Sequence, residues 1–127
     1  FNTILKCTSL NYCRCLQPDE IVDVLSTYDC LLLPTHYYTE GFPGSILDAY
    51  RSGIPVIVSK WKYAHEFVSE GKTGFIADFN NPLPDIVSAI NKLLSDHQLL
   101  NEMKNNAYKE ATKYTEDVAW KIISKYL

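Results

Sequence analysis

The chain has 127 residues, of which 46% are hydrophobic and 13% aromatic, enough for one globular domain with a packed core. Its formal net charge of -3, with scattered lysines, argues against a nucleic-acid surface, because such a surface needs a concentrated basic stripe. No apolar run approaches the ~20 residues that span a bilayer, so we expect a cytoplasmic protein, with peripheral membrane association only through a full-length protein.

The N-terminal segment and the cysteines support this expectation. Residues 1–12 lack the basic head and long apolar middle of a signal peptide, and the absence of a starting Met suggests that the chain is part of a longer protein. A zinc site would need two ligand pairs, whereas the sequence offers one C-x-C and an isolated His36. We therefore expect reduced thiols and no metal site from the four cysteines, Cys7, Cys13, Cys15 and Cys30.

Strands and helices are predicted to alternate along the chain. Residues 3–15 contain one or two short strand-like runs, and Pro18 to Glu20 begin a helix whose apolar face extends to Thr27. The run "CLLLPT", Cys30 to Thr35, is typical of a strand that is buried on both faces and ended by Pro.

A helix is predicted next, from Pro43 or Gly44 to Gly53, because Pro suits the first helical turn and Gly the position just past the last. The run "PVIVS" that follows is a second buried strand. The remaining elements are a helix from Ala64 to Glu70 closed by Gly71, a strand at residues 74–78, and helices at about 84–94, 96–113 and 115–126. The first of these last three helices carries an apolar face of Ile86, Val87, Ile90, Leu93 and Leu94.

This alternation predicts an α/β fold with a doubly wound, mostly parallel sheet of the Rossmann type. In such a sheet, ligands bind beyond the carboxyl ends of the strands. We therefore expect a ligand site at residues 35–45 and 59–65.

The stretch "TEGFPGSILDAYRSGIPVIVS" carries the chemistry of that region. A helix beginning near Gly44 leaves the amides of Gly44, Ser45 and Ile46 as unsatisfied donors at the positive end of the helix dipole, which suits a phosphate. Gly41 and Gly44 remove side chains where a ligand can touch the backbone, and Pro43 fixes the entry angle. The loop therefore favours close approach by an anion.

Two carboxylates flank this loop. Asp48, about one turn into the helix, is placed to accept from vicinal hydroxyls, and Glu40 is placed to accept from a sugar hydroxyl or stabilise developing positive charge. Phosphate donors between two hydroxyl acceptors suggest a sugar nucleotide. Taken singly, an acidic residue near a helix start more often only favours the dipole, and a Gly after a helix is more often only a cap.

The motif "EGFPGSILDAYRSGIPVIVS" resembles the signature of retaining glycosyltransferases of the GT-B fold, the glycosyl transferases group 1 type. The flanking "YDCLLLPT", "EFVSEGKTGFIAD" and "IVSAINKLLSD" agree with the same family, so the similarity covers about residues 14–112. The resemblance implies a C-terminal, donor-binding domain of a larger enzyme.

Site residues follow from the resemblance position by position. It implies that Glu40 is the catalytic carboxylate that meets the donor sugar, and that Asp48, where the family has a longer Glu, binds the ribose directly or through water. Cys15 and Leu16 fall where the family places backbone beside the base, and Arg14 stands where a Gly is common. The implied donor-binding residues are Glu40, Gly41, Phe42, Pro43, Gly44, Ser45 and Asp48.

The resemblance also implies partners and a reaction. The donor is a nucleotide diphosphate sugar, no metal or other cofactor is required, and the acceptor, a carbohydrate or a lipid-linked molecule, binds mostly to an N-terminal Rossmann-like domain absent from this chain. A hexose would be transferred in polysaccharide or glycolipid biosynthesis, and the isolated chain would be inactive. The alternative is a non-catalytic nucleotide-binding or regulatory module of the same fold.

Overall fold

The computed structural model describes residues 10–127. Of the strand-like runs predicted at residues 3–15, the part before residue 10 lies outside the described residues, and residues 10–15 form no strand, so the prediction is wrong there. The backbone turns at Arg14, whose φ of 67° is incompatible with a strand. The helix expected after Glu20 is confirmed as α2 (Ile21–Leu25), although it ends before Thr27.

Three parallel strands form the sheet of the described residues, as predicted for an α/β fold. β1 (Leu31–Leu33), β2 (Val56–Ser59) and β3 (Gly74–Ala77) lie in the order β1-β2-β3. β2 is buried along its whole length, as expected for the central strand. β1 lies at the edge of the described sheet and its Leu32 is 46% exposed, so the prediction that this strand is buried on both faces is wrong.

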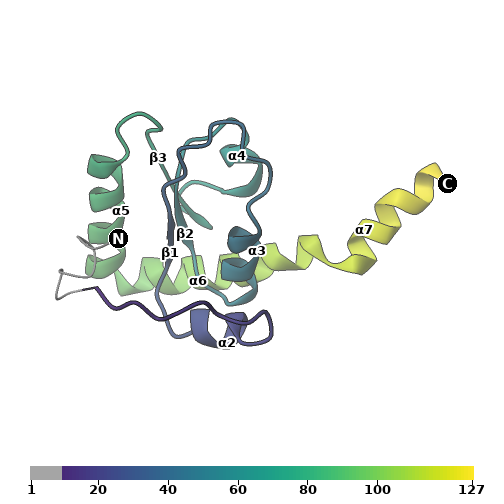
Figure 1. The fold of residues 1–127 in the computed structure, drawn as a ribbon, viewed down its shortest axis with the longest axis horizontal. Coiled ribbons are helices and arrows are strands. Elements are labelled where there is room, and N and C mark those ends of the chain that lie inside the picture. The colour runs from purple at the N-terminus through teal and green to yellow at the C-terminus, as the bar shows by residue number, and fades with distance from the viewer. Residues whose placement is uncertain (1–9) are drawn as a thin grey trace.

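Helices cover both faces of this sheet. Figure 1 shows α3 and α4 on one side of the strands and α5 on the other, with α6 contacting both α3 and α5 and α7 extending away from the body. Two short 3-10 segments, η1 (Thr112–Tyr114) and η2 (Ser124–Tyr126), flank α7. The bounds of these helices are α3 Gly44–Arg51, α4 Ala64–Phe67, α5 Leu83–Ser95, α6 His97–Ala111 and α7 Glu116–Ile123.

Alternation along β2 divides the core into two clusters. Val56 and Val58 point to the α3 side, where they pack with Ile46 and Tyr50, whereas Ile57 points to the α5 side. The residues of the second cluster are Ile57, Phe75, Ala77, Ile86, Ala89, Leu93, Leu100 and Met103. Both layers hold the carboxyl ends of the strands in place, and these ends carry the site described below.

The prediction for α3 is confirmed, and two other helix predictions need correction. α3 spans Gly44–Arg51 and Gly53 follows it with φ 68°, as predicted. α4 is only one turn long, with Val68 as its C-cap, so Gly71 does not close it. On α5, Ile86, Ala89 and Leu93 are buried, whereas Val87 and Leu94, which were predicted on the apolar face, are 48% and 69% exposed because only one narrow stripe meets the sheet.

Within residues 10–127, no helix combines the length and the apolarity that crossing a membrane requires.

Candidate functional site

Loops from different strands meet at the carboxyl edge of the sheet. The hydroxyl of Ser59, the last residue of β2, donates to the carbonyl oxygen of Thr35, just after β1, at 2.6 Å. The rings of Tyr38 and Phe79, from the loops after β1 and β3, lie edge to face with centroids 5.2 Å apart. These contacts join residues 35–38 to the ends of both neighbouring strands, so the beginning of the predicted ligand region is held in place.

Glu40 is held by hydrogen bonds within the same segment. Its Oε2 accepts a hydrogen bond from the Oγ1 of Thr35 at 3.1 Å, and its amide donates to the carbonyl of Tyr37 at 3.1 Å. The carbonyl of Thr35 accepts a hydrogen bond from Ser59 at the end of β2. Thr35, which follows β1, therefore links the Glu40 carboxylate to the ends of both strands. The half-buried side chain of Glu40 is therefore positioned by neighbours rather than freely solvated.

The five glycines of the chain fall into two groups. Gly53 and Gly71 have φ of 68° and 72°, and a Cβ on Gly74 would lie 2.2 Å from the carbonyl oxygen of Val56, so the fold itself requires glycine there. Gly41 and Gly44 do not have a positive φ, and no heavy atom of the described part of the chain lies within 4 Å of a Cβ added to either. These two glycines leave open space in front of the backbone.

The start of α3 faces that open space. Pro43, in an extended conformation, is its N-cap, and no side chain among residues 10–127 caps the helix. The sequence predicted three free amides here, but the amide of Ile46 donates to the carbonyl of Pro43 at 3.0 Å, because the first turn closes on itself. The uncapped helix end at Gly44 and Ser45, with open space in front of Gly41 and Gly44, suits a small anion.

Asp48 lies one turn after Gly44 on the same face of α3. Helical side chains lean towards the N-terminus, so this carboxylate is directed towards the open helix start. Among the described residues no side chain or amide bonds to it, although its backbone carbonyl accepts from Ser52. A half-buried carboxylate without a protein partner remains available to hydroxyl donors.

Phe42 behaves differently from the other predicted site residues. Its ring stacks on Phe67 of α4, with centroids 4.4 Å apart, and contacts Tyr114 of η1 at 4.9 Å. The side chain is therefore engaged with the protein, and Phe42 contributes to the site through the backbone of its loop.

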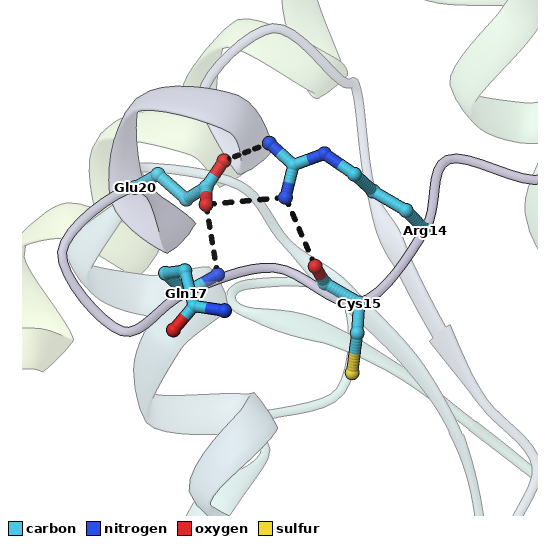
Figure 2. Close-up of polar contacts among 4 residues, drawn as sticks. All are labelled: Arg14, Cys15, Gln17 and Glu20. Carbon is cyan, nitrogen blue, oxygen red and sulfur yellow. Dashed lines mark hydrogen bonds and ion pairs between the residues drawn. The ribbon is translucent and has the colours of Figure 1, made fainter.

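The segment before α2 is tied by a polar cluster shown in Figure 2. The Arg14 guanidinium donates to the carbonyl of Cys15 at 3.0 Å and pairs with Glu20, whose Oε2 also accepts from the amide of Gln17 at 2.9 Å. The hydrogen bond from Arg14 lowers the pKa of Glu20 below its ordinary value. The left-handed φ of Arg14 explains why glycine suits this position.

Other candidate residues are not brought together by the fold. Among residues 10–127 no group of three or more metal-ligating side chains is close enough to hold an ion. His36 and His65 are exposed, whereas Trp61 is 1% exposed and packs in the core. One hollow of about 190 Å³ lies over β3 and α5, and another of about 540 Å³ lies between α2, α3 and α6. Neither hollow is lined by Glu40 or Asp48.

Residues 11–110 match the family model described as "Glycosyl transferases group 1". The chain belongs to this family of glycosyltransferases. Among its relatives, an N,N'-diacetylbacillosaminyl-diphospho-undecaprenol alpha-1,3-N-acetylgalactosaminyltransferase of Campylobacter jejuni is 33% identical over 85% of this chain and 27% of that protein. A UDP-Gal:alpha-D-GlcNAc-diphosphoundecaprenol alpha-1,3-galactosyltransferase of Escherichia coli is 34% identical over 69% of this chain and 22% of that protein.

Several solved structures share the fold. Anabaena HepE in complex with UDP-glucose aligns with a TM-score of 0.69 at 22% identity, over 83% of this chain and 30% of that one. The C-terminal domain of LpcC, a group 1 family glycosyl transferase of Francisella tularensis, aligns with a TM-score of 0.65 at 21% identity, over 83% of this chain and 51% of that one. The expected Rossmann-like half of a GT-B fold is thus confirmed, and the chain spans about a quarter of the length of the curated relatives named above.

Sequence reasoning located the group 1 motif but missed the residues that support it. Thr35 was predicted as a strand end and as the first residue of the expected ligand region, but its hydrogen bond to Glu40 gives no sequence signal beyond the presence of a hydroxyl. Phe67 and Tyr114 lie far from Phe42 along the chain, so only the fold brings the three rings together.

Proposed function

We propose that this chain is the donor-binding C-terminal domain of a retaining glycosyltransferase that uses a nucleotide diphosphate sugar. The observation that carries the proposal is the pair of glycines, Gly41 and Gly44, at an uncapped helix start: no contact or backbone angle of the described residues requires glycine at either position. A ligand that touches the backbone at this point would explain both glycines, because a side chain at either position would block its approach.

The arrangement suits a sugar nucleotide in three parts. The amides at Gly44 and Ser45 donate to the diphosphate at the positive end of the α3 dipole. Asp48, one turn further on, accepts from the ribose hydroxyls, and Glu40 accepts from the transferred sugar. UDP-glucose is bound in the HepE structure, and the name of the Escherichia coli relative includes UDP-Gal, which supports a UDP-sugar as the first donor to test.

Catalysis in this proposal is chiefly stabilisation of the leaving group. The bond from the anomeric carbon to the diphosphate oxygen breaks, negative charge grows on the diphosphate, and the amides at the α3 start stabilise it in place. The acceptor hydroxyl attacks from the same face and passes its proton to the departing diphosphate oxygen, so the new glycosidic bond forms with retention. Glu40, fixed by Thr35, stabilises positive charge on the sugar ring as the bond lengthens.

The remainder of the enzyme lies outside this chain. We propose that an N-terminal Rossmann-like domain binds a carbohydrate or lipid-linked acceptor, that the sugar is a hexose or its derivative, and that the isolated chain does not turn over. The names of the two bacterial relatives include diphospho-undecaprenol or diphosphoundecaprenol, which supports a lipid-linked acceptor and peripheral contact with a membrane through the full-length protein.

Titration calorimetry on the full-length protein tests the proposal. UDP, GDP and their sugars are titrated into wild type and into Glu40→Ala and Asp48→Ala, with Glu116→Ala on the exposed start of α7 as a matched acidic control. We expect binding of one nucleotide, weakened about tenfold or more by Asp48→Ala through loss of charged hydrogen bonds and unchanged by the control. Glu40→Ala should abolish sugar transfer while the bare nucleotide still binds. Binding of nucleotide by all variants without any transfer by wild type would favour a non-catalytic module instead.

A further inference from the structure

Three aromatic rings from distant parts of the chain converge behind the donor loop. The ring of Phe42 stacks on that of Phe67, with centroids 4.4 Å apart and an interplanar angle of 16°. On the same ring, Tyr114 packs with centroids 4.9 Å apart and an angle of 31°. Phe42 is the aromatic residue of the Gly41–Ser45 loop, and both of these ring partners lie outside that loop.

Phe67 is itself anchored. Its carbonyl oxygen accepts a hydrogen bond from the hydroxyl of Tyr50 at 2.7 Å, and the same hydroxyl lies 3.1 Å from the Oγ1 of Thr73. Tyr50 is fully buried in α3, the helix that the donor loop enters. The backbone of Phe67 is therefore held to α3, whereas no hydrogen bond among the described residues holds the Tyr114 side chain, so Tyr114 is the partner to remove in a test of the stack.

Tyr114 sits where the chain leaves the core. It packs against the core from η1, directly after α6, whereas α7, which begins two residues later, has no buried residue and extends away from the body (Figure 1). The position of Tyr114 is thus fixed by α6 and by whatever path the chain takes beyond it.

The donor loop has little else to hold it. Gly41 and Gly44 have wide backbone freedom, and a Cβ added to either meets no heavy atom of residues 10–127 within 4 Å. If the Phe42 ring is released, residues between the two glycines gain conformations that a bound donor must remove, and that ordering lowers affinity.

We propose that Tyr114 is a positioning residue for the sugar-nucleotide donor: with Phe67 it clamps the Phe42 ring and so holds the backbone of Gly41–Ser45 in its receiving conformation. The proposal rests on the proposed function of the loop. It assigns a role to a residue outside the group 1 motif, at the junction between the donor domain and α7.

Two substitutions in the full-length protein separate this role from ordinary packing. Tyr114→Ala removes the ring and Tyr114→Phe keeps it while removing the hydroxyl. Tyr108→Ala is the control, because Tyr108 is a 63% exposed tyrosine one turn and a half earlier on α6 and is not part of the stack. For Tyr114→Ala we expect a rise of about three- to tenfold in the KM and Kd of the donor, with kcat within about twofold of wild type. Tyr114→Phe and Tyr108→Ala should match wild type.

Hydrogen exchange without donor gives an independent readout. Amides of residues 41–47 should exchange faster in Tyr114→Ala than in wild type and Tyr114→Phe, and saturating donor should remove the difference. If Tyr114→Ala lowers the Tm but leaves both the donor KM and this exchange unchanged, the ring only packs the core and the proposal is wrong.

Two further outcomes are distinguishable. If Tyr114→Ala does not fold, Tyr114→Leu, which keeps apolar volume without a ring, is compared with Tyr114→Phe in the same assays, and equal KM values overturn the clamp. If wild type binds no sugar nucleotide, the proposed function fails, while exchange at residues 41–47 in the absence of donor still decides whether Tyr114 orders the loop.

Discussion

The substitution Gly44→Ala should affect protein stability and donor affinity in opposite ways. Gly44 is the first residue of α3, and a Cβ added there meets no heavy atom of the described residues within 4 Å. Alanine also restricts the unfolded chain, so the free energy of unfolding should rise by about 0.4 to 1 kcal/mol. If a phosphate oxygen approaches the backbone there, the methyl group prevents one charge-assisted hydrogen bond, worth about 1.5 to 3 kcal/mol. The Kd of the donor should therefore rise by about tenfold to a hundredfold.

The control is the glycine at the other end of the same helix. Gly53 has φ 68°, and an added Cβ there makes only ordinary contacts, at 3.9 Å from the Cβ of Tyr108. Gly53→Ala should lower the free energy of unfolding by about 1 to 2 kcal/mol through backbone strain and leave the Kd of the donor unchanged. Urea denaturation gives the free energy of unfolding of each variant, and titration calorimetry gives its Kd for the donor. A Gly44→Ala protein that binds the donor as tightly as wild type would refute close approach at the helix start.

Two further predictions concern side chains that support the site. Thr35→Val removes the hydroxyl that donates to Glu40, so kcat/KM for sugar transfer should fall about tenfold, while Thr35→Ser should retain it; equal rates for both would mean that the hydrogen bond does not position the carboxylate. Burial raises the pKa of Tyr50 to about 12. Because the folded state favours the neutral phenol, its contribution to stability is complete below pH 10 and is lost as pH rises through 12, by about 2 to 3 kcal/mol. Tyr50→Phe should remove this extra alkaline loss, as measured by denaturation at pH 9 and pH 11, and a parallel loss in both proteins would contradict the assignment.

Elements with strong local signals were predictable from the sequence. α3 carries its own start and stop, Pro43 and Gly53, and β2 is a continuous apolar run whose position in the sheet follows from its pattern. The donor motif is contiguous in sequence, from Glu40 to Asp48, so a single loop and helix start bring its members together.

Predictions failed where tertiary contacts decide. β1 has the same apolar composition as a central strand, but Leu32 is exposed because β1 lies at the edge of the described sheet. The exposure of Val87 on α5 depends on which stripe meets the sheet, and periodicity alone leaves two adjacent stripes open. The packing of Phe42 against Tyr114 has no local signal at all, since it requires α6 to return beneath α3.

The most direct test is a titration of this chain, labelled with 15N at glycine, with UDP- and GDP-sugars, followed by heteronuclear NMR. The chain contains five glycines, so five backbone signals report on five positions. A donor seated at the start of α3 should shift the signals of Gly41 and Gly44 most and those of Gly53 and Gly71, at turns on other parts of the fold, least. Saturable binding that leaves Gly41 and Gly44 unshifted, or no shift with any nucleotide, would contradict a donor site at this loop.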